Sequence, residues 1–287
     1  MLTDIASVGF RVENFTHENM AILEKNWPGI RQALLETVEL VDSFGFDSRT
    51  IQATNSLLPV AYYLYRKGAP RDFETSDRFL NDRKVIRGWL TRSILKESGI
   101  WGSGLDTLLT ALREVIRNSD RSEFPARELR RVMAQRGKTL DFVEEEIEDL
   151  ADMKLGDRRV FPLLTMLFPH LESRDGSDID HVFPQSRFTP NRLKTASVAD
   201  EQIESFRDRC DRLANLQLLD RSVNNEKRAT LPSDWLDVHC PDSRSRQHYC
   251  GRHLLGDVPR EFKNFTGYYD ARRERLRNRI ADLVNAV

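Results

Sequence analysis

Apolar residues recur at the period of an α-helix through the first half of the chain, and this spacing limits the fold more than any other feature. The clearest stripe consists of Leu108, Leu109, Leu112 and Ile116. At about 3.6 residues per turn, these side chains share one face and predict a helix with one buried side. Ser103 with Asp106 supplies a start signal for it. Further helices are expected at 20–41, 51–65, 85–94 and 143–150. Residues 1–172 are therefore predicted to form an α-helical domain.

The composition is that of an ordinary globular protein, with 39% hydrophobic and 31% charged residues in a chain of 287. The longest apolar stretch, 160–169, contains two prolines and is shorter than the roughly 20 residues that a membrane helix needs. The first residues lack the basic flank and apolar core of a secretory signal. Three cysteines, an odd number, do not make a disulfide framework. These features predict a cytoplasmic protein with no membrane segment.

Charge is unevenly distributed along the chain. The net charge is −1, so any DNA contact must depend on local patches rather than on a global positive field. Acidic residues gather at Asp141, Glu144, Glu145, Glu146, Glu148, Asp149 and Asp152. Basic residues become frequent later, and the expected contacts with a DNA backbone are Arg187, Arg192, Lys194, Arg221 and Arg228.

A polar, turn-rich segment at 173–178 marks the expected start of a second domain, residues 173–287. A short apolar strand follows and is cut by Pro184. Beyond it, the pattern predicts a helix at 201–213, a short strand at 215–219 and a short helix at 222–228. A long terminal helix is expected after Pro259, with one face formed by Phe262, Phe265, Tyr269, Leu276, Ile280 and Leu283.

Four polar residues in this second domain can together hydrolyse a phosphodiester. Asp180 and His181 follow the first strand, Asn215 begins the second, and Asn224 falls on the short helix. Such a reaction needs a base that activates water, a cation that offsets phosphate charge, and a scaffold that holds both. Histidine suits the base because its ordinary pKa of about 6.5 leaves it neutral near neutral pH. Carboxylate and amide oxygens suit a hard cation such as Mg²⁺ or Mn²⁺.

The Asp180-His181 pair carries a geometric difficulty. Adjacent side chains on a regular strand point to opposite faces, so both can reach one site only if the strand ends or bulges there. Because a proline cannot donate to a sheet ladder, Pro184 predicts that regular pairing fades close to this dipeptide.

Three motifs that follow one another along the second domain resemble those of a known nuclease family. They are Asp180-His181-Val182-Phe183-Pro184-Gln185-Ser186, Ala214-Asn215-Leu216-Gln217-Leu218-Leu219 and Asn224-Asn225-Glu226-Lys227. Together they resemble the C-terminal HNH nuclease region of GmrSD-type modification-dependent restriction proteins, including phosphorothioate-sensing defence nucleases of the SspE type. The same order is similar to the HNH domain of CRISPR effector nucleases. The likeness covers residues 178–236, and linked motifs are far more specific than any one alone.

The resemblance implies a ββα-metal fold that binds one Mg²⁺ or Mn²⁺ ion and nicks double-stranded DNA in restriction or antiviral defence. His181 would be the general base and Asp180 a metal ligand. Asn215 would brace the loop that holds the base. Asn224 would be the second metal ligand, with Asn225 as the competing choice, and Lys227 would lie near the phosphate.

One motif of such proteins is missing. They usually begin with a nucleotide-hydrolysing sensor domain that carries an Asp-Gly-Gln-Gln-Arg motif, and this chain contains no such motif. The chain therefore looks like a C-terminal fragment, and the sensor domain is expected as a separate partner.

Simpler interpretations stand beside several of these residues. Lys227 and Arg228 could form a solvated helix face. The arginines at 272, 273, 275, 277 and 279 are expected to form a solvated face with ion pairs along the helix, with phosphate contact as the alternative. Zinc is not expected at Cys240, Cys250, His239, His248 and His253, whose spacing is irregular. Cys210 and His170 have no companion motif and are expected to be structural.

Two other functions remain open from the residues. The chain could be a DNA-binding or assembly module whose nuclease site is vestigial, in which case binding would be salt-dependent and independent of His181. It could also be an HNH enzyme that cuts RNA, because nothing in the motifs selects between the two nucleic acids.

Overall fold

A computed structural model describes residues 1–3, 5, 8–9, 12–51, 53–96, 99–171 and 176–286. The chain is mainly helical with one small sheet among these residues, which confirms the predicted fold class at that level. It forms two compact units, Met1–Phe142 with the last two residues, and Val143–Asn285. The units divide at 142/143, earlier than the expected boundary at 172/173. Residues 172 and 173 themselves lie outside the described residues. No helix in the described ranges is both long and apolar enough to span a membrane.

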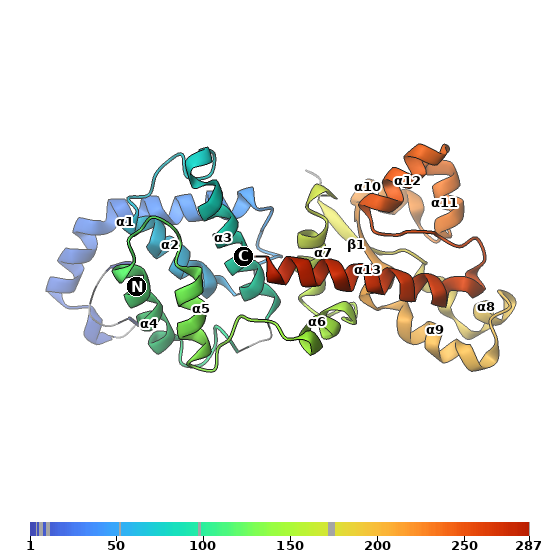
Figure 1. The fold of residues 1–287 in the computed structure, drawn as a ribbon, viewed down its shortest axis with the longest axis horizontal. Helices are drawn as coiled ribbons and strands as arrows, with labels where there is room; N and C mark the ends of the chain where they lie inside the picture. Colours follow the sequence, from blue (N-terminus) through green and yellow to red (C-terminus); the bar gives the residue numbers. More distant parts are fainter. Residues whose placement is uncertain are drawn as a thin grey trace. The chain divides into compact units, whose positions relative to one another are not determined.

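The first unit is a set of helices (Figure 1). They are α1 (His17–Ser43), α2 (Leu57–Arg66), α3 (Leu80–Leu95), α4 (Leu105–Asn118) and α5 (Ala126–Ala134). The helix expected at 51–65 begins only at Leu57, after a short turn of 3₁₀ helix. The start signal at Ser103 is wrong, because α4 is preceded by Gly104 at φ +70° and has no side-chain cap. Helix α5 was not predicted. It buries only Leu129 and Met133, so its apolar stripe is too short to show a helical period.

The second unit surrounds a two-stranded sheet with helices (Figure 1). Its early helices are α6 (Glu144–Ala151), α7 (Val160–Leu167), α8 (Pro190–Thr195) and α9 (Ile203–Cys210). Its later helices are α10 (Arg221–Lys227), α11 (Pro232–His239), α12 (Ser243–Arg252) and α13 (Phe265–Asn285). The strands are β1 (Ser177–His181) and β2 (Leu216–Asp220). The predicted order of strand, strand and short helix is present in β1, β2 and α10.

The sheet is a single antiparallel pair whose register is regular from Ser177 opposite Asp220 to His181 opposite Leu216. Helix α10 follows β2 without a loop, because the Asp220 side chain accepts a hydrogen bond from the Ser222 backbone at 2.9 Å and starts the helix. The helix ends at Lys227, because Arg228 takes φ +46°. This arrangement lays α10 against both strands.

Helix α13 forms the core of the second unit and packs on α6, α7 and α9. Near the start of α13, an aromatic cluster holds the segment that follows β1 in place. The cluster consists of Phe183, Phe188, Phe206, Phe262 and Phe265, with ring centroids 5.0–5.9 Å apart in six of its pairs. Five buried rings in stacked, edge and tilted contact hold this loop in place, because aromatic pairs add to the stability that area burial alone supplies.

The arginines of α13 hold the second unit together, and the prediction of a solvated face is wrong for Arg272, Arg273, Arg275 and Arg277. Arg275 donates to the Leu255 carbonyl at 2.8 Å. Arg272 is fully buried and donates to the backbone carbonyls of Ala214 at 2.9 Å and His253 at 3.3 Å. Arg273 pairs with Glu148 at 2.6 Å and with Asp152. Arg277 pairs with Glu144 and Glu148.

Three residues of the acidic segment are therefore paired within the unit. Glu144 and Glu148 lie on α6 and Asp152 directly follows it, and all three pair with arginines of α13. Val143, predicted on the buried stripe, is the exposed residue before α6, whereas Ile147 and Leu150 are buried. These contacts explain why α6 and α7 belong to the second unit and not to the first.

We expect Arg272→Ala to lower the free energy of unfolding by about 2–4 kcal/mol, because it leaves two buried carbonyls without donors and opens a cavity. Arg279→Ala, at an exposed position of the same helix, should stay within about 0.5 kcal/mol of the parent. Chemical denaturation followed by circular dichroism measures both. Equal stability of the two variants would show that Arg272 does not anchor α13.

Candidate functional site

Asp180 and His181 lie at the end of β1, and the strand does not bulge between them. Asp180 is opposite Gln217 and His181 opposite Leu216, and the Val182 N–H still donates to the Asn215 carbonyl at 2.8 Å. The strand ends at His181, as Pro184 predicted, but its register is regular up to that residue. The ending therefore does not turn both side chains to one face. The pleat sends the two side chains to opposite faces of β1.

On one face, the Asp180 carboxylate meets two donors. Its Oδ2 accepts from the Gln217 side chain at 2.9 Å and pairs with the Lys227 ammonium at 2.8 Å. Lys227 is only 1% exposed and also donates to the His181 carbonyl at 2.7 Å. Burial lowers the pKa of Lys227, and Asp180 acts in the opposite direction. Lys227 is thus a buried bridge between α10 and β1, which corrects the solvated-face interpretation.

Asn224 lies on the same side of α10 as Lys227, because residues three apart on a helix are neighbours. It is half-buried, whereas Asn225 is exposed. Within the described residues, neither the Asn224 amide nor Asp180 Oδ1 has a hydrogen bond. Carboxylate and amide oxygens are donor types that Mg²⁺ and Mn²⁺ prefer. The burial pattern favours Asn224 over Asn225 as the second ligand.

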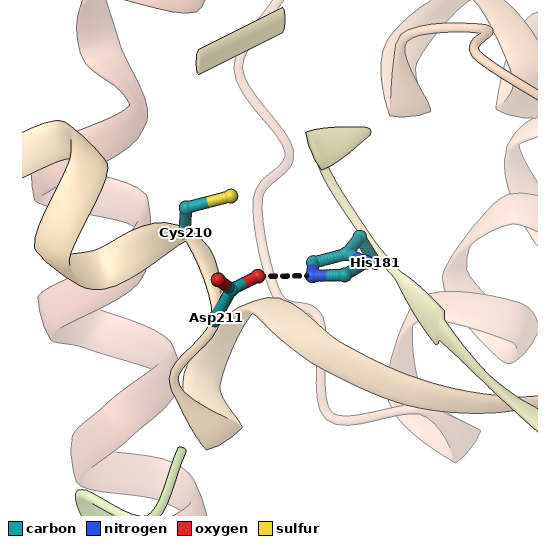
Figure 2. Close-up of side chains that lie close together, drawn as sticks. All are labelled: His181, Cys210 and Asp211. Carbon is teal, nitrogen blue, oxygen red and sulfur yellow. Dashed lines mark hydrogen bonds and ion pairs between the residues drawn. The ribbon is translucent and has the colours of Figure 1, made fainter. Parts of the chain in front are cut away.

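On the other face, His181 is held by a carboxylate that the sequence did not point to. Its Nε2 lies 2.8 Å from Asp211 Oδ1 (Figure 2). The Gln185 amide donates to the same oxygen at 3.1 Å. Because an ionised carboxylate only accepts, a neutral His181 carries its proton on Nε2 and leaves Nδ1 with a free lone pair. His181 is 14% exposed on its side chain and Asp211 is 40% exposed, so water reaches this pair.

Asn215 ties the segments around the site to one another. It is fully buried, accepts from the Phe183 N–H at 2.9 Å, and donates to the carbonyls of Phe183 at 3.0 Å and Cys210 at 2.8 Å. A buried amide with three hydrogen bonds is costly to disturb. Asn215 therefore fixes the loop after His181 against the end of α9, which is the geometry that its expected bracing role requires.

Cys210, expected to be structural, lies beside the same pair. Its sulfur and one ligand atom each of His181 and Asp211 lie within 4.8 Å of one another (Figure 2). Burial, and then the charge of Asp211, raise the pKa of the Cys210 thiol to about 12. The free thiol is therefore protonated at neutral pH.

The predicted DNA contacts lie on short helices next to the site, and most already have partners. Arg187 donates to the Ala229 carbonyl at 3.2 Å and Arg192 to the Ser186 carbonyl at 2.7 Å. Lys194 pairs with Asp200 at 3.0 Å, and Arg221 with Asp178 at 3.4 Å. Arg192, Lys194, Arg221 and Arg228 are exposed, so the surface pairs can rearrange at little cost.

Two of the remaining histidines stack on aromatic rings, and both remaining cysteines are buried. His239 stacks on Trp235 at 4.2 Å, and His253 stacks on Tyr249 at 4.1 Å. Cys240 and Cys250 are buried, and His248 is exposed. The His170 carbonyl accepts from Arg252 at 2.9 Å. Burial, followed by the charge of Arg272, lowers the pKa of His253 to about 3, so its ring stays neutral.

The chain matches no protein-family model and no curated protein. The function is therefore argued from the geometry of the site.

Stability is expected to fall in acid because of His253. Its folded-state pKa lies below its unfolded value of about 6.5, so the unfolded chain binds the extra proton and stability drops as the pH falls from there toward 3. His253→Phe keeps a stacked ring without the titration, and should reduce the slope of unfolding free energy against pH by roughly 1 kcal/mol per unit. Denaturant titrations across this pH range measure the slope. His248→Phe, at an exposed position, should leave it unchanged, and identical slopes for all three proteins would contradict this account.

Proposed function

We propose that this chain is a metal-dependent HNH-type endonuclease that nicks double-stranded DNA, acting in modification-dependent restriction or antiviral defence. One observation carries the proposal: the histidine at the end of β1 is held by a carboxylate through one ring nitrogen, with Asp180 beside it on the strand and α10 packed against that strand. A base, a hard-cation ligand and a scaffold are the parts that phosphodiester hydrolysis needs.

Asp180 and Asn224 would hold the cation, because their free oxygens are hard donors on the α10 side of β1. Bound there, Mg²⁺ or Mn²⁺ would offset the charge that develops on the phosphate. Lys227 would act on Asp180 rather than on the phosphate, since its ammonium is buried against the carboxylate and the His181 carbonyl. Lys227 would thereby hold Asp180 and His181 in place through the Asp180 carboxylate and the His181 carbonyl.

Asp211 would act as a positioning residue for the base. By accepting from Nε2, it leaves Nδ1 of His181 to take a proton from the attacking water. Asn215 would keep the loop after His181 rigid, so that this nitrogen stays in place. A phosphate that reaches both His181 and the cation would lie across the edge of β1 that β2 does not cover.

A second candidate is a DNA-binding or assembly module with a vestigial site. The buried pair of Asp180 and Lys227 favours it, because the carboxylate is already neutralised without a cation. The two candidates differ in one respect, which is whether any divalent ion supports cleavage.

The full chain with Mg²⁺ or Mn²⁺ is expected to convert supercoiled plasmid to the nicked form. His181→Ala should lose on the order of 10²–10⁴-fold in rate, as removal of a general base does. Asp211→Ala should lose about 10–100-fold, because the imidazole remains but is no longer held. Gel analysis of plasmid over time gives these rates.

Matched variants serve as controls for this assay. His248→Ala removes an exposed histidine and should cut as the parent does. Asn224→Ala should be inactive and Asn225→Ala active if Asn224 is the ligand. Salt-dependent DNA binding without a product under any metal, unchanged in His181→Ala, would establish the second candidate. If the chain cuts a matched RNA faster than the DNA, then RNA and not DNA is its substrate.

A further inference from the structure

Three donor atoms of different kinds meet on the face of β1 away from Asp180. The ligand atoms of His181, Cys210 and Asp211 all lie within 4.8 Å of one another, and the metal-ligand types of the described residues form no other such group (Figure 2). Cys210 is the last residue of α9, Asp211 follows it, and His181 ends β1. The hydrogen bonds of Asn215 to the Cys210 carbonyl and to Phe183 hold these two segments together.

The donor set differs from the one around Asp180. Thiolate and imidazole are softer ligands than carboxylate or amide oxygen, and they favour zinc over Mg²⁺. A tetrahedral zinc ion with one sulfur, one nitrogen and one oxygen ligand places these atoms about 3.3–3.7 Å apart. The widest separation therefore has to contract by up to about 1 Å, and the 2.8 Å between His181 Nε2 and Asp211 Oδ1 has to widen to about 3.3 Å. Side-chain rotation at the end of α9 can supply both changes. Asp211 is 40% exposed, which gives an ion a path from solvent.

We propose that His181, Cys210 and Asp211 form a site for a soft divalent cation of the zinc class, with its fourth position open to water. As the ion binds, the Cys210 thiol releases its proton to solvent, and the His181 proton moves from Nε2 to Nδ1 so that Nε2 can hold the ion. The pleat of β1 then separates two cation classes, the hard ion on the Asp180 face and the soft ion on the His181 face. Occupied by zinc, His181 no longer accepts a proton from water, so zinc inhibits cleavage; this consequence rests on the proposed nuclease function.

Cobalt(II) added to the reduced full chain reports the site directly, without any nuclease assay. We expect a thiolate-to-cobalt charge-transfer band with the visible bands of a tetrahedral ion, and their loss when Zn²⁺ is added. Cys210→Ser should lack the charge-transfer band. Cys240→Ser and Cys250→Ser, which alter the chain's other two cysteines, should keep it. Cys210→Ala gives a second test, and circular dichroism establishes that each variant is folded.

Cleavage assays test the inhibitory role. With Mg²⁺ in excess, a concentration of Zn²⁺ that displaces the cobalt should slow nicking on the order of 10²-fold, the scale of a lost general base. A zinc-selective chelator should restore the rate. The rate of Cys210→Ser, compared with its own rate in the absence of zinc, should not fall when zinc is added.

The outcomes separate the two proposals. If the parent protein gives the thiolate-to-cobalt band but never nicks DNA, the soft-cation site is supported and the proposed nuclease function is wrong. A parent that nicks DNA without a thiolate band, or a Cys210→Ser variant that keeps the band, overturns the soft-cation site alone.

Discussion

The alternation of side chains along β1 is the constraint on which the candidate site depends. Asp180 and His181 are neighbours in a regular ladder, so their side chains leave opposite faces of one strand. Helix α10 supplies Lys227 and Asn224 on the first face, and the end of α9 supplies Asp211 and Cys210 on the second. In the nuclease that we propose, the base and the cation would act on the same phosphate at the strand edge between the two faces.

Buried polar groups hold this arrangement, and each of them has a main-chain partner. Lys227 donates to the His181 carbonyl, Arg272 to the Ala214 carbonyl, and Asn215 to those of Phe183 and Cys210. Leaving such a group unpaired costs far more than the net gain from forming its bond, so these contacts specify one geometry. The second unit thereby fixes the segments on both sides of β1 while leaving the side chains of His181 and Asp211 within reach of water.

Much of this organisation could be predicted from local sequence. Helical spacing predicted α1, α3, α4 and α13, and the motif order predicted the strand, strand and helix of β1, β2 and α10. What local patterns could not show is pairing through space. Asp211 and Cys210 carry no motif and matter only because Asn215 draws the end of α9 against the loop after His181. The arginines of α13 looked like a solvated face because their partners lie on α6, far away along the chain.

We propose that Asp180 and Asn224 form a hard-cation site beside an oriented His181. Anomalous diffraction from crystals of the full chain soaked in Mn²⁺ tests this site most directly. We expect one strong peak within coordination distance of Asp180 Oδ1 and the Asn224 amide oxygen, and no such peak in crystals of Asp180→Ala. The absence of a peak at Asp180, or a peak that persists without its carboxylate, would rule the site out.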